Sequence, residues 1–123
     1  MRTKDVIKHI ITWLTDYSDS SKTKGFVVGI SGGIDSAITS TLCALSGKNT
    51  LCILMPIHQN EQEFNRSNEH AKWLTSKFSN VSIFKVDLSE TFDTLFKEIP
   101  TDIKSDLSMA NTRARIRMTT LYT

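Results

Sequence analysis

One short segment contains most of the residues that could do chemistry. It reads Gly-Ile-Ser-Gly-Gly-Ile-Asp-Ser over residues 29–36 and continues an apolar run at residues 26–30. Glycines let the main chain come close to an anion, and the start of a helix presents unpaired N–H groups and the positive end of its dipole. Ser31 and Ser36 add hydroxyl donors, whereas Asp35 adds a carboxylate that an anion site tolerates only beside a cation. The segment therefore predicts a site for a phosphate chain together with Mg²⁺.

The pattern differs from the Walker loop, in which a Lys and then a Ser or Thr follow the last glycine. Here Ile34 and Asp35 follow Gly33, and the next Lys along the chain is Lys48. The pattern Ser-Gly-Gly-x-Asp-Ser instead resembles the pyrophosphate loop of the ATP pyrophosphatases, which cleave ATP between its α and β phosphates. The structural alternative is a plain glycine turn in which Asp35 or Ser36 only caps the helix.

A regular succession of helices and strands is expected to position this loop. Apolar periodicity predicts strands at residues 26–30, 50–55 and 81–86, and helices at residues 4–17, 35–45 and 61–78. Two further helices are expected, one with Ser89 as its N-cap and one from Ser105 or Asp106 to Tyr122. Strands that alternate with helices predict an α/β fold with a parallel sheet and helices on both faces. Ligands of such sheets bind at the carboxyl ends of the strands, where the glycine loop lies.

Composition limits the remaining possibilities. The chain has 123 residues, which indicates one domain. Its net charge of +2 gives no sign of a surface that binds nucleic acid or membranes. Cys43 and Cys52 lie in apolar stretches and are expected to be reduced core residues of a cytoplasmic protein. The histidines His9, His58 and His70 have no metal-ligand spacing, so we interpret them as surface or structural residues.

A second distinctive segment lies near the C-terminus and contains Arg113, Arg115 and Arg117. At helical spacing Arg113 and Arg117 share a face and Arg115 points elsewhere. Such a run is most often a solvated basic face. The residue pattern of this segment, Ala-Asn-x-x-Ala-Arg-x-Arg-Met-x-x-Leu-Tyr, closely resembles a motif of the NAD synthetases. The loop at residues 29–37 and the Met55-Pro56 step resemble the same family, in the same order.

The resemblance implies a fold of the adenine nucleotide alpha hydrolase type, which is Rossmann-like, and a role for each matching residue. ATP would bind at Gly29, Ile30, Ser31, Gly32, Gly33, Ile34, Asp35 and Ser36. Asp35 would ligate Mg²⁺, Arg115 would contact deamido-NAD, and residues 54–56 would lie near the adenine. The implied reaction adenylates the nicotinate carboxylate of deamido-NAD with ATP and then amidates it with ammonia, giving NAD, AMP and pyrophosphate.

This chain is shorter than the family that it resembles, since family members continue for about as many residues again. The resemblance therefore implies that residues 1–123 are the N-terminal part of a synthetase domain, truncated and inactive alone, without the second acidic Mg²⁺ ligand. No glutaminase domain precedes the first strand, so free ammonia is the expected nitrogen source. The family also implies a homodimer. The last helix has an apolar stripe that would enter that interface or pack on the chain's own sheet: Leu107, Ala110, Ala114, Met118 and Leu121.

Two other interpretations remain open on sequence alone. The chain could belong to another ATP pyrophosphatase, such as a GMP synthetase or a tRNA-modifying enzyme. It could also be a non-catalytic nucleotide-binding or dimerisation module.

Overall fold

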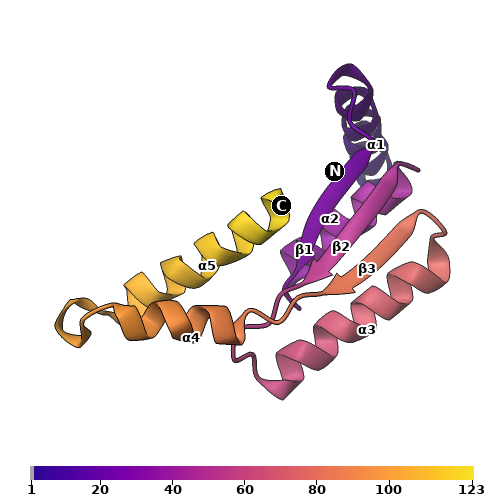
Figure 1. Ribbon diagram of the computed structural model, residues 1–123. Coiled ribbons are helices and arrows are strands. Elements are labelled where there is room, and N and C mark those ends of the chain that lie inside the picture. The colour runs from indigo at the N-terminus through magenta and orange to yellow at the C-terminus, as the bar shows by residue number, and fades with distance from the viewer. Residues whose placement is uncertain (1) are drawn as a thin grey trace.

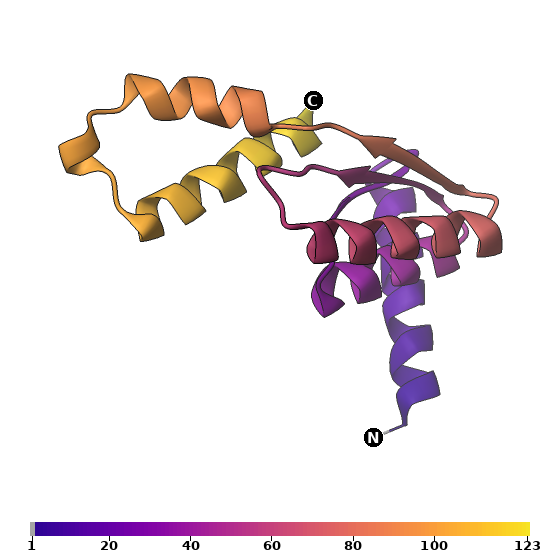
Figure 2. The ribbon, with the colours of Figure 1, turned by 90° about the horizontal axis from the view of Figure 1, so that it is seen from below.

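The computed structural model describes residues 2–123 as helices alternating with strands (Figures 1 and 2). The strands are β1 (Gly25–Ile30), β2 (Asn49–Leu54) and β3 (Val81–Lys85). The helices are α1 (Thr3–Ser20), α2 (Ile34–Leu45), α3 (Glu61–Lys77), α4 (Ser89–Glu98) and α5 (Asp106–Tyr122), with a short 3-10 helix, η1 (Thr101–Ile103), before α5.

The strands form one parallel sheet in the order β1-β2-β3. Ile30 pairs with Leu54, and Leu54 pairs with Lys85, so the carboxyl ends of all three strands lie along one edge. The predicted parallel sheet is therefore confirmed. Within the described residues β1 pairs with β2 alone and is an edge strand. Val27 of β1 is 48% exposed, on the face of the sheet that it shares with Leu51 and Phe84.

Helices α2 and α3 cover one face of the sheet (Figure 2). Alternate residues of each strand point toward these helices, as the pleat requires. They form a core in which Leu74 and Cys52 are fully buried. The buried members of this core are Ile30, Ala44, Cys52, Leu54, Ala71, Leu74 and Val81.

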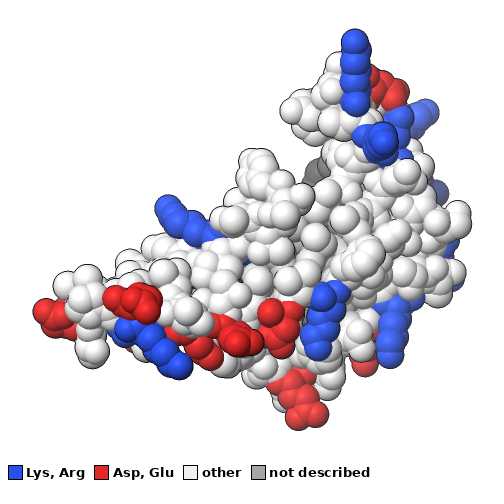
Figure 3. Space-filling view, viewed as in Figure 1, with Lys and Arg blue, Asp and Glu red and all other residues white. Residues whose placement is uncertain are grey.

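Helices α4 and α5 cover only part of the opposite face, beside the carboxyl ends of β1 and β2. Met109, Ile116 and Leu121 of α5 pack against a second core of five buried residues: Ile53, Met55, Ile57, Leu88 and Phe92. Helices thus lie on both faces, as predicted. The rest of this face stays open, with Phe84 61% exposed, and Figure 3 shows mostly uncharged atoms over it.

The apolar stripe predicted for the last helix is only partly covered by the described chain. Leu121 packs on the chain's own core, whereas Leu107 is 75% exposed and Met118 is 52% exposed. Ala110 and Ala114 are exposed as well. The alternative in which the stripe packs on the chain's own sheet thus holds for Leu121 and not for Leu107.

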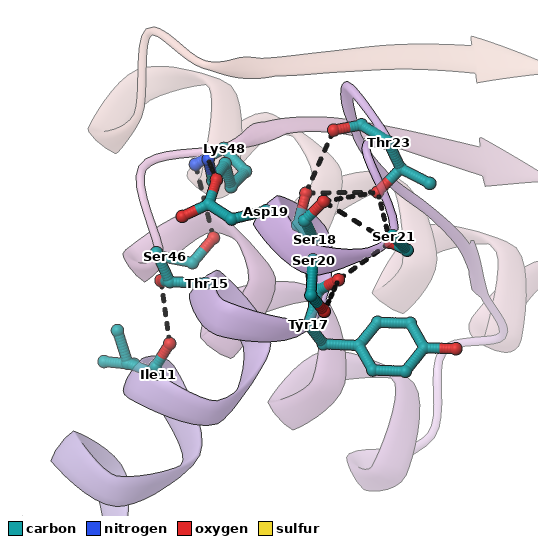
Figure 4. Close-up of polar contacts among 10 residues, drawn as sticks. All are labelled: Ile11, Thr15, Tyr17, Ser18, Asp19, Ser20, Ser21, Thr23, Ser46 and Lys48. Atoms are coloured by element: carbon teal, nitrogen blue, oxygen red, sulfur yellow. Dashed lines mark hydrogen bonds and ion pairs between the residues drawn. The ribbon is translucent and has the colours of Figure 1, made fainter.

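The end of α1 and the N-cap of α4 differ from the sequence prediction, and side-chain hydrogen bonds explain both. Helix α1 continues to Ser20 because the hydroxyl groups that follow it bond back to the helix, as when Ser21 Oγ donates to the Tyr17 carbonyl oxygen at 2.7 Å (Figure 4). The predicted N-cap role of Ser89 is wrong, since Leu88 is the N-cap of α4. Ser89 Oγ instead accepts a hydrogen bond from the His58 main-chain N–H at 3.0 Å.

The two cysteines lie where the sequence predicts, buried and without a disulfide partner. Burial raises the pKa of both thiols, to about 11 for Cys52, so they are unreactive at neutral pH. In the described part of the chain, every helix is too short or too polar to cross a lipid bilayer.

Candidate functional site

The glycine loop connects the carboxyl end of β1 to the start of α2, and its shape depends on Gly32. This residue has a φ of +86°, in the left-handed region that glycine alone adopts readily. A Cβ at Gly32 would lie 2.8 Å from the Glu63 carbonyl oxygen of α3. Gly32 therefore permits both the turn and the close approach of the loop to α3.

Two serine hydroxyls hold the loop in this shape. The Ser31 N–H donates to Ser36 Oγ at 3.0 Å, and the two hydroxyl oxygens lie 3.0 Å apart. The Gly33 N–H donates to Ser31 Oγ at 3.3 Å. The hydroxyls that the sequence suggested as ligand donors thus also organise the main chain around the loop.

The first turn of α2 leaves main-chain donors free. Within residues 2–123 no acceptor is present for the N–H groups of Ile34, Asp35 and Ser36, which is the normal condition of a helix start without a ligand. Gly33 is the N-cap and makes no side-chain cap bond. The alternative in which Asp35 or Ser36 caps the helix is therefore wrong, and the donors remain available to an anion.

A pocket of about 580 Å³ opens beside the loop. Residues 29–33 form one wall of this pocket, and Met55 lies at the end of β2. The opposite wall comes from α5, by way of Ala114, Arg117, Met118 and Leu121. The structure therefore brings the two distinctive sequence segments to one cavity.

Side chains after β2 close the pocket and were not predicted from sequence. Gln59 Nε2 donates to the Ser31 carbonyl oxygen at 3.2 Å, and Arg66 Nε donates to the Gly32 carbonyl oxygen at 3.4 Å. Glu63 lines the same cavity. The only sequence signal for them is their place after the second strand, at the edge where ligands bind.

The arginines of α5 divide as their spacing predicts. Arg117 is half-buried in the pocket, and its Nε donates to the Met55 carbonyl oxygen at 3.0 Å. Burial lowers the pKa of the Arg117 guanidinium, Arg113 lowers this pKa further, and Glu63 opposes both effects. Arg115 is exposed and does not line the loop pocket. The structure thus brings Arg117 to the loop, whereas the sequence singled out Arg115.

Asp35 is the one predicted metal ligand. Its carboxylate is exposed and makes no hydrogen bond or ion pair within the described chain. Residues 2–123 contain no cluster of three or more His, Cys, Asp or Glu side chains that could hold a metal alone. Mg²⁺ commonly takes one or two protein carboxylates and completes its shell with phosphate oxygens and water. Asp35 therefore fits a Mg²⁺ ion that arrives with a phosphate chain.

Comparison with known proteins connects this geometry to one family. The family model described as NAD synthase matches residues 6–123. The chain is 36% identical over 119 residues to the NH(3)-dependent NAD(+) synthetase of Mycoplasma genitalium, covering 94% of this chain and 46% of that protein. It is 40% identical over 113 residues to the enzyme of the same name from Finegoldia magna, covering 89% of this chain and 44% of that protein.

Solved structures agree with the sequence comparisons. The NH3-dependent NAD synthetase of Campylobacter jejuni, solved with a nitrate ion, superposes with a TM-score of 0.86 at 27% identity, over 99% of this chain and 51% of that one. The NMN synthetase of Francisella tularensis superposes with a TM-score of 0.87 at 25% identity, over 99% of this chain and 49% of that one. This chain spans about half the length of the relatives that it matches. From its loop, its arginine helix and these matches, the chain belongs to the NAD synthase family.

Proposed function

We propose that this chain supplies the ATP-binding part of an ammonia-dependent NAD synthetase. The observation that carries the proposal is the row of unpaired N–H groups at Ile34, Asp35 and Ser36, beside a pocket of about 580 Å³. Such a row binds phosphate oxygens, and the positive end of α2 favours their charge. The proposed reaction is inferred from the relatives named NH(3)-dependent NAD(+) synthetase.

The triphosphate of ATP lies along residues 29–36 in this proposal. The N–H groups at the start of α2 receive its oxygens, and Asp35 holds Mg²⁺ against them. Mg²⁺ held by Asp35 would supply positive charge beside the departing pyrophosphate. The adenine lies near residues 54–56, where Met55 borders the pocket.

The reaction then proceeds in two transfers. A carboxylate oxygen of the nicotinate group in deamido-NAD bonds to the α-phosphorus of ATP, and the bond to pyrophosphate breaks. Ammonia then bonds to the carbonyl carbon of the mixed anhydride, AMP leaves with the bridging oxygen, and a proton is released. Catalysis of this kind relies chiefly on positioning and on stabilising the developing charge. In this proposal the main-chain donors of residues 34–36 serve both tasks.

In this proposal, Arg115 and the exposed side of α5 bind the dinucleotide at the contact between two copies of the chain. Arg115 is exposed, and on the same helix the apolar side chains of Leu107 and Met118 are 75% and 52% exposed. An exposed apolar stripe of this kind favours a protein partner. Sedimentation across a wide concentration range tests the homodimer, which should dissociate on dilution; a monomer at every concentration would reject it.

The reaction itself is tested by product analysis. Purified protein is mixed with ATP, Mg²⁺, ammonium and deamido-NAD, and NAD and AMP are separated by chromatography. Equal amounts of the two products are expected from an active synthetase. Nicotinate mononucleotide is tested in parallel, because one structural relative is named NMN synthetase. ATP turnover that needs neither nicotinate substrate would overturn the proposed reaction.

A further inference from the structure

Arg117 lies between two neighbouring pockets. One is the loop pocket, and the other has a volume of about 370 Å³ and lies toward α4. Gln59, Glu63 and Arg117 border both cavities, whereas Arg113 and His58 border only the second. A ligand bound at the glycine loop can therefore reach Arg117, and a longer ligand can reach Arg113.

The charges of the two arginines are not balanced within the described chain. Arg113 and Arg117 lie one helical turn apart on α5, where like charges repel. No carboxylate oxygen of residues 2–123 forms an ion pair with either guanidinium within 4.0 Å. The nearby Asp93 carboxylate is paired with His58 Nε2 at 2.7 Å. Glu63 alone opposes the two positive charges in the shared wall.

Both guanidinium groups are half-buried, held in place and still able to donate. Arg117 Nε is fixed by the Met55 carbonyl oxygen at 3.0 Å, and its two terminal nitrogens have no hydrogen-bond partner in the described part of the chain. Arg113 lies over the Phe92 ring, 5.7 Å from its centroid, and makes no hydrogen bond there. Partial burial lowers the pKa of Arg117, which indicates a charge that an anion would stabilise.

We propose that Arg113 and Arg117 form a phosphate clamp, a second phosphate subsite where the loop pocket adjoins the pocket beside α4. The planar donor fork of arginine matches two oxygens of a phosphate group. The glycine loop itself contains no lysine or arginine, so side-chain cations for a phosphate come from neighbouring elements, and Arg66 of α3 and Arg117 of α5 line its pocket. The identity of its ligand rests on the proposed function, in which both ATP and the dinucleotide carry a diphosphate group.

Calorimetric titration of the purified chain tests the clamp with three probes: inorganic pyrophosphate, ATP and deamido-NAD. The variants are Arg117→Met, Arg117→Lys and Arg113→Met. Arg113→Met is the second variant because Arg113 makes no hydrogen bond within the described chain, so its loss threatens folding least. Lys72→Met is the matched control, since Lys72 is exposed on α3 and lines neither pocket. Far-UV circular dichroism verifies that each variant is folded.

Arg117→Met and Arg113→Met are expected to weaken pyrophosphate binding by about tenfold or more, and Lys72→Met by less than about twofold. Arg117→Lys keeps the charge without the fork and should recover part of the loss. A defect with ATP but not with deamido-NAD assigns the clamp to the phosphates of ATP, and the reverse assigns it to the dinucleotide.

The clamp is overturned if both methionine variants bind all three probes as tightly as the unmodified chain. It is also overturned if the unmodified chain binds none of them. A protein that binds pyrophosphate through these arginines but forms no NAD would retain the clamp and lose the proposed reaction, so the two failures are distinguishable.

Discussion

Arg117 Nε donates a hydrogen bond to the main-chain carbonyl oxygen of Met55 at 3.0 Å, across 62 positions of sequence. This bond ties α5 to the end of β2, beside the glycine loop. It fixes the wall of the loop pocket and leaves the terminal nitrogens of the guanidinium directed to other partners. The contact therefore joins the arginine segment to the Met55-Pro56 step, two of the three segments that resemble the family.

Gly32 is expected to be the structurally demanding glycine of the loop. Gly32→Ala should lower the free energy of unfolding by about 1–3 kcal/mol, because alanine at a φ of +86° is strained and its Cβ meets the Glu63 carbonyl oxygen at 2.8 Å. Urea denaturation measures the change.

Gly33→Ala is the matched control for this prediction. Gly33 has a φ of −91°, and a Cβ there would meet only Ser31 Oγ, at 3.4 Å. This variant should change stability by less than about 1 kcal/mol. Equal losses in the two variants would show that the turn conformation of Gly32 is not what limits substitution in the loop.

Asp35→Asn should weaken the binding of Mg·ATP while leaving the fold unchanged. The Asp35 carboxylate makes no hydrogen bond or ion pair within the described chain, so its loss removes no structural contact. Loss of one carboxylate ligand to Mg²⁺ is expected to reduce affinity by about tenfold or more. Titration of ATP with and without Mg²⁺ measures this effect. Identical Mg·ATP affinity in the variant would remove Asp35 from the metal site.

Arg115→Ala should raise the KM for deamido-NAD far more than the KM for ATP in an active synthetase. Its side chain is exposed and lies outside the loop pocket, so it is free to serve the second substrate. Steady-state kinetics with each substrate varied in turn measures both constants. An equal rise for the two substrates, or a loss of thermal stability alone, would give Arg115 a structural role.

His70 is expected to make stability depend on pH. Its Nε2 lies 2.9 Å from the hydroxyl of fully buried Ser40, joining α3 to α2. Burial lowers the pKa of His70 below its ordinary 6.5, so the folded state takes up the proton less readily than the unfolded state. This contribution to stability is complete above pH 6.5 and is lost as pH falls through the lowered pKa.

Urea denaturation at about pH 7.5 and at about pH 5.5 measures the effect of His70. His70→Gln should reduce the difference in unfolding free energy between the two conditions. Asp87 does not confuse the comparison: a hydrogen bond from the Ser89 main chain lowers its pKa, so it titrates below 3.8. An unchanged difference in the variant would assign the pH dependence to other groups.

Much of this fold could be predicted from the sequence, because local patterns determine it. The apolar runs before Ser31 and Pro56 and the alternation at residues 81–85 are local signals, and they predict the strands within one or two residues. Ser105, which caps α5 in a reciprocal hydrogen-bond pair with Ser108, is a local signal of the same kind.

Apart from the end of α1, the misses depend on contacts distant in sequence. Ser89 resembles an N-cap, but its hydroxyl instead accepts a hydrogen bond from His58, 31 positions away. Helical spacing predicts that Arg113 and Arg117 share one face of the helix. It does not predict that Arg117 on this face lines the loop pocket. That orientation depends on the packing of Ile116 against the second core. The need for Gly32 likewise comes partly from α3.

Amide NMR of the chain titrated with Mg·ATP tests the central claim most directly. The claim is that the unpaired N–H groups at the start of α2 receive the phosphates of ATP. The account predicts that the amide resonances of Ile34, Asp35 and Ser36 shift most, and that those of α1 stay in place. Shifts confined to other parts of the chain, or none at saturating ATP, would contradict it.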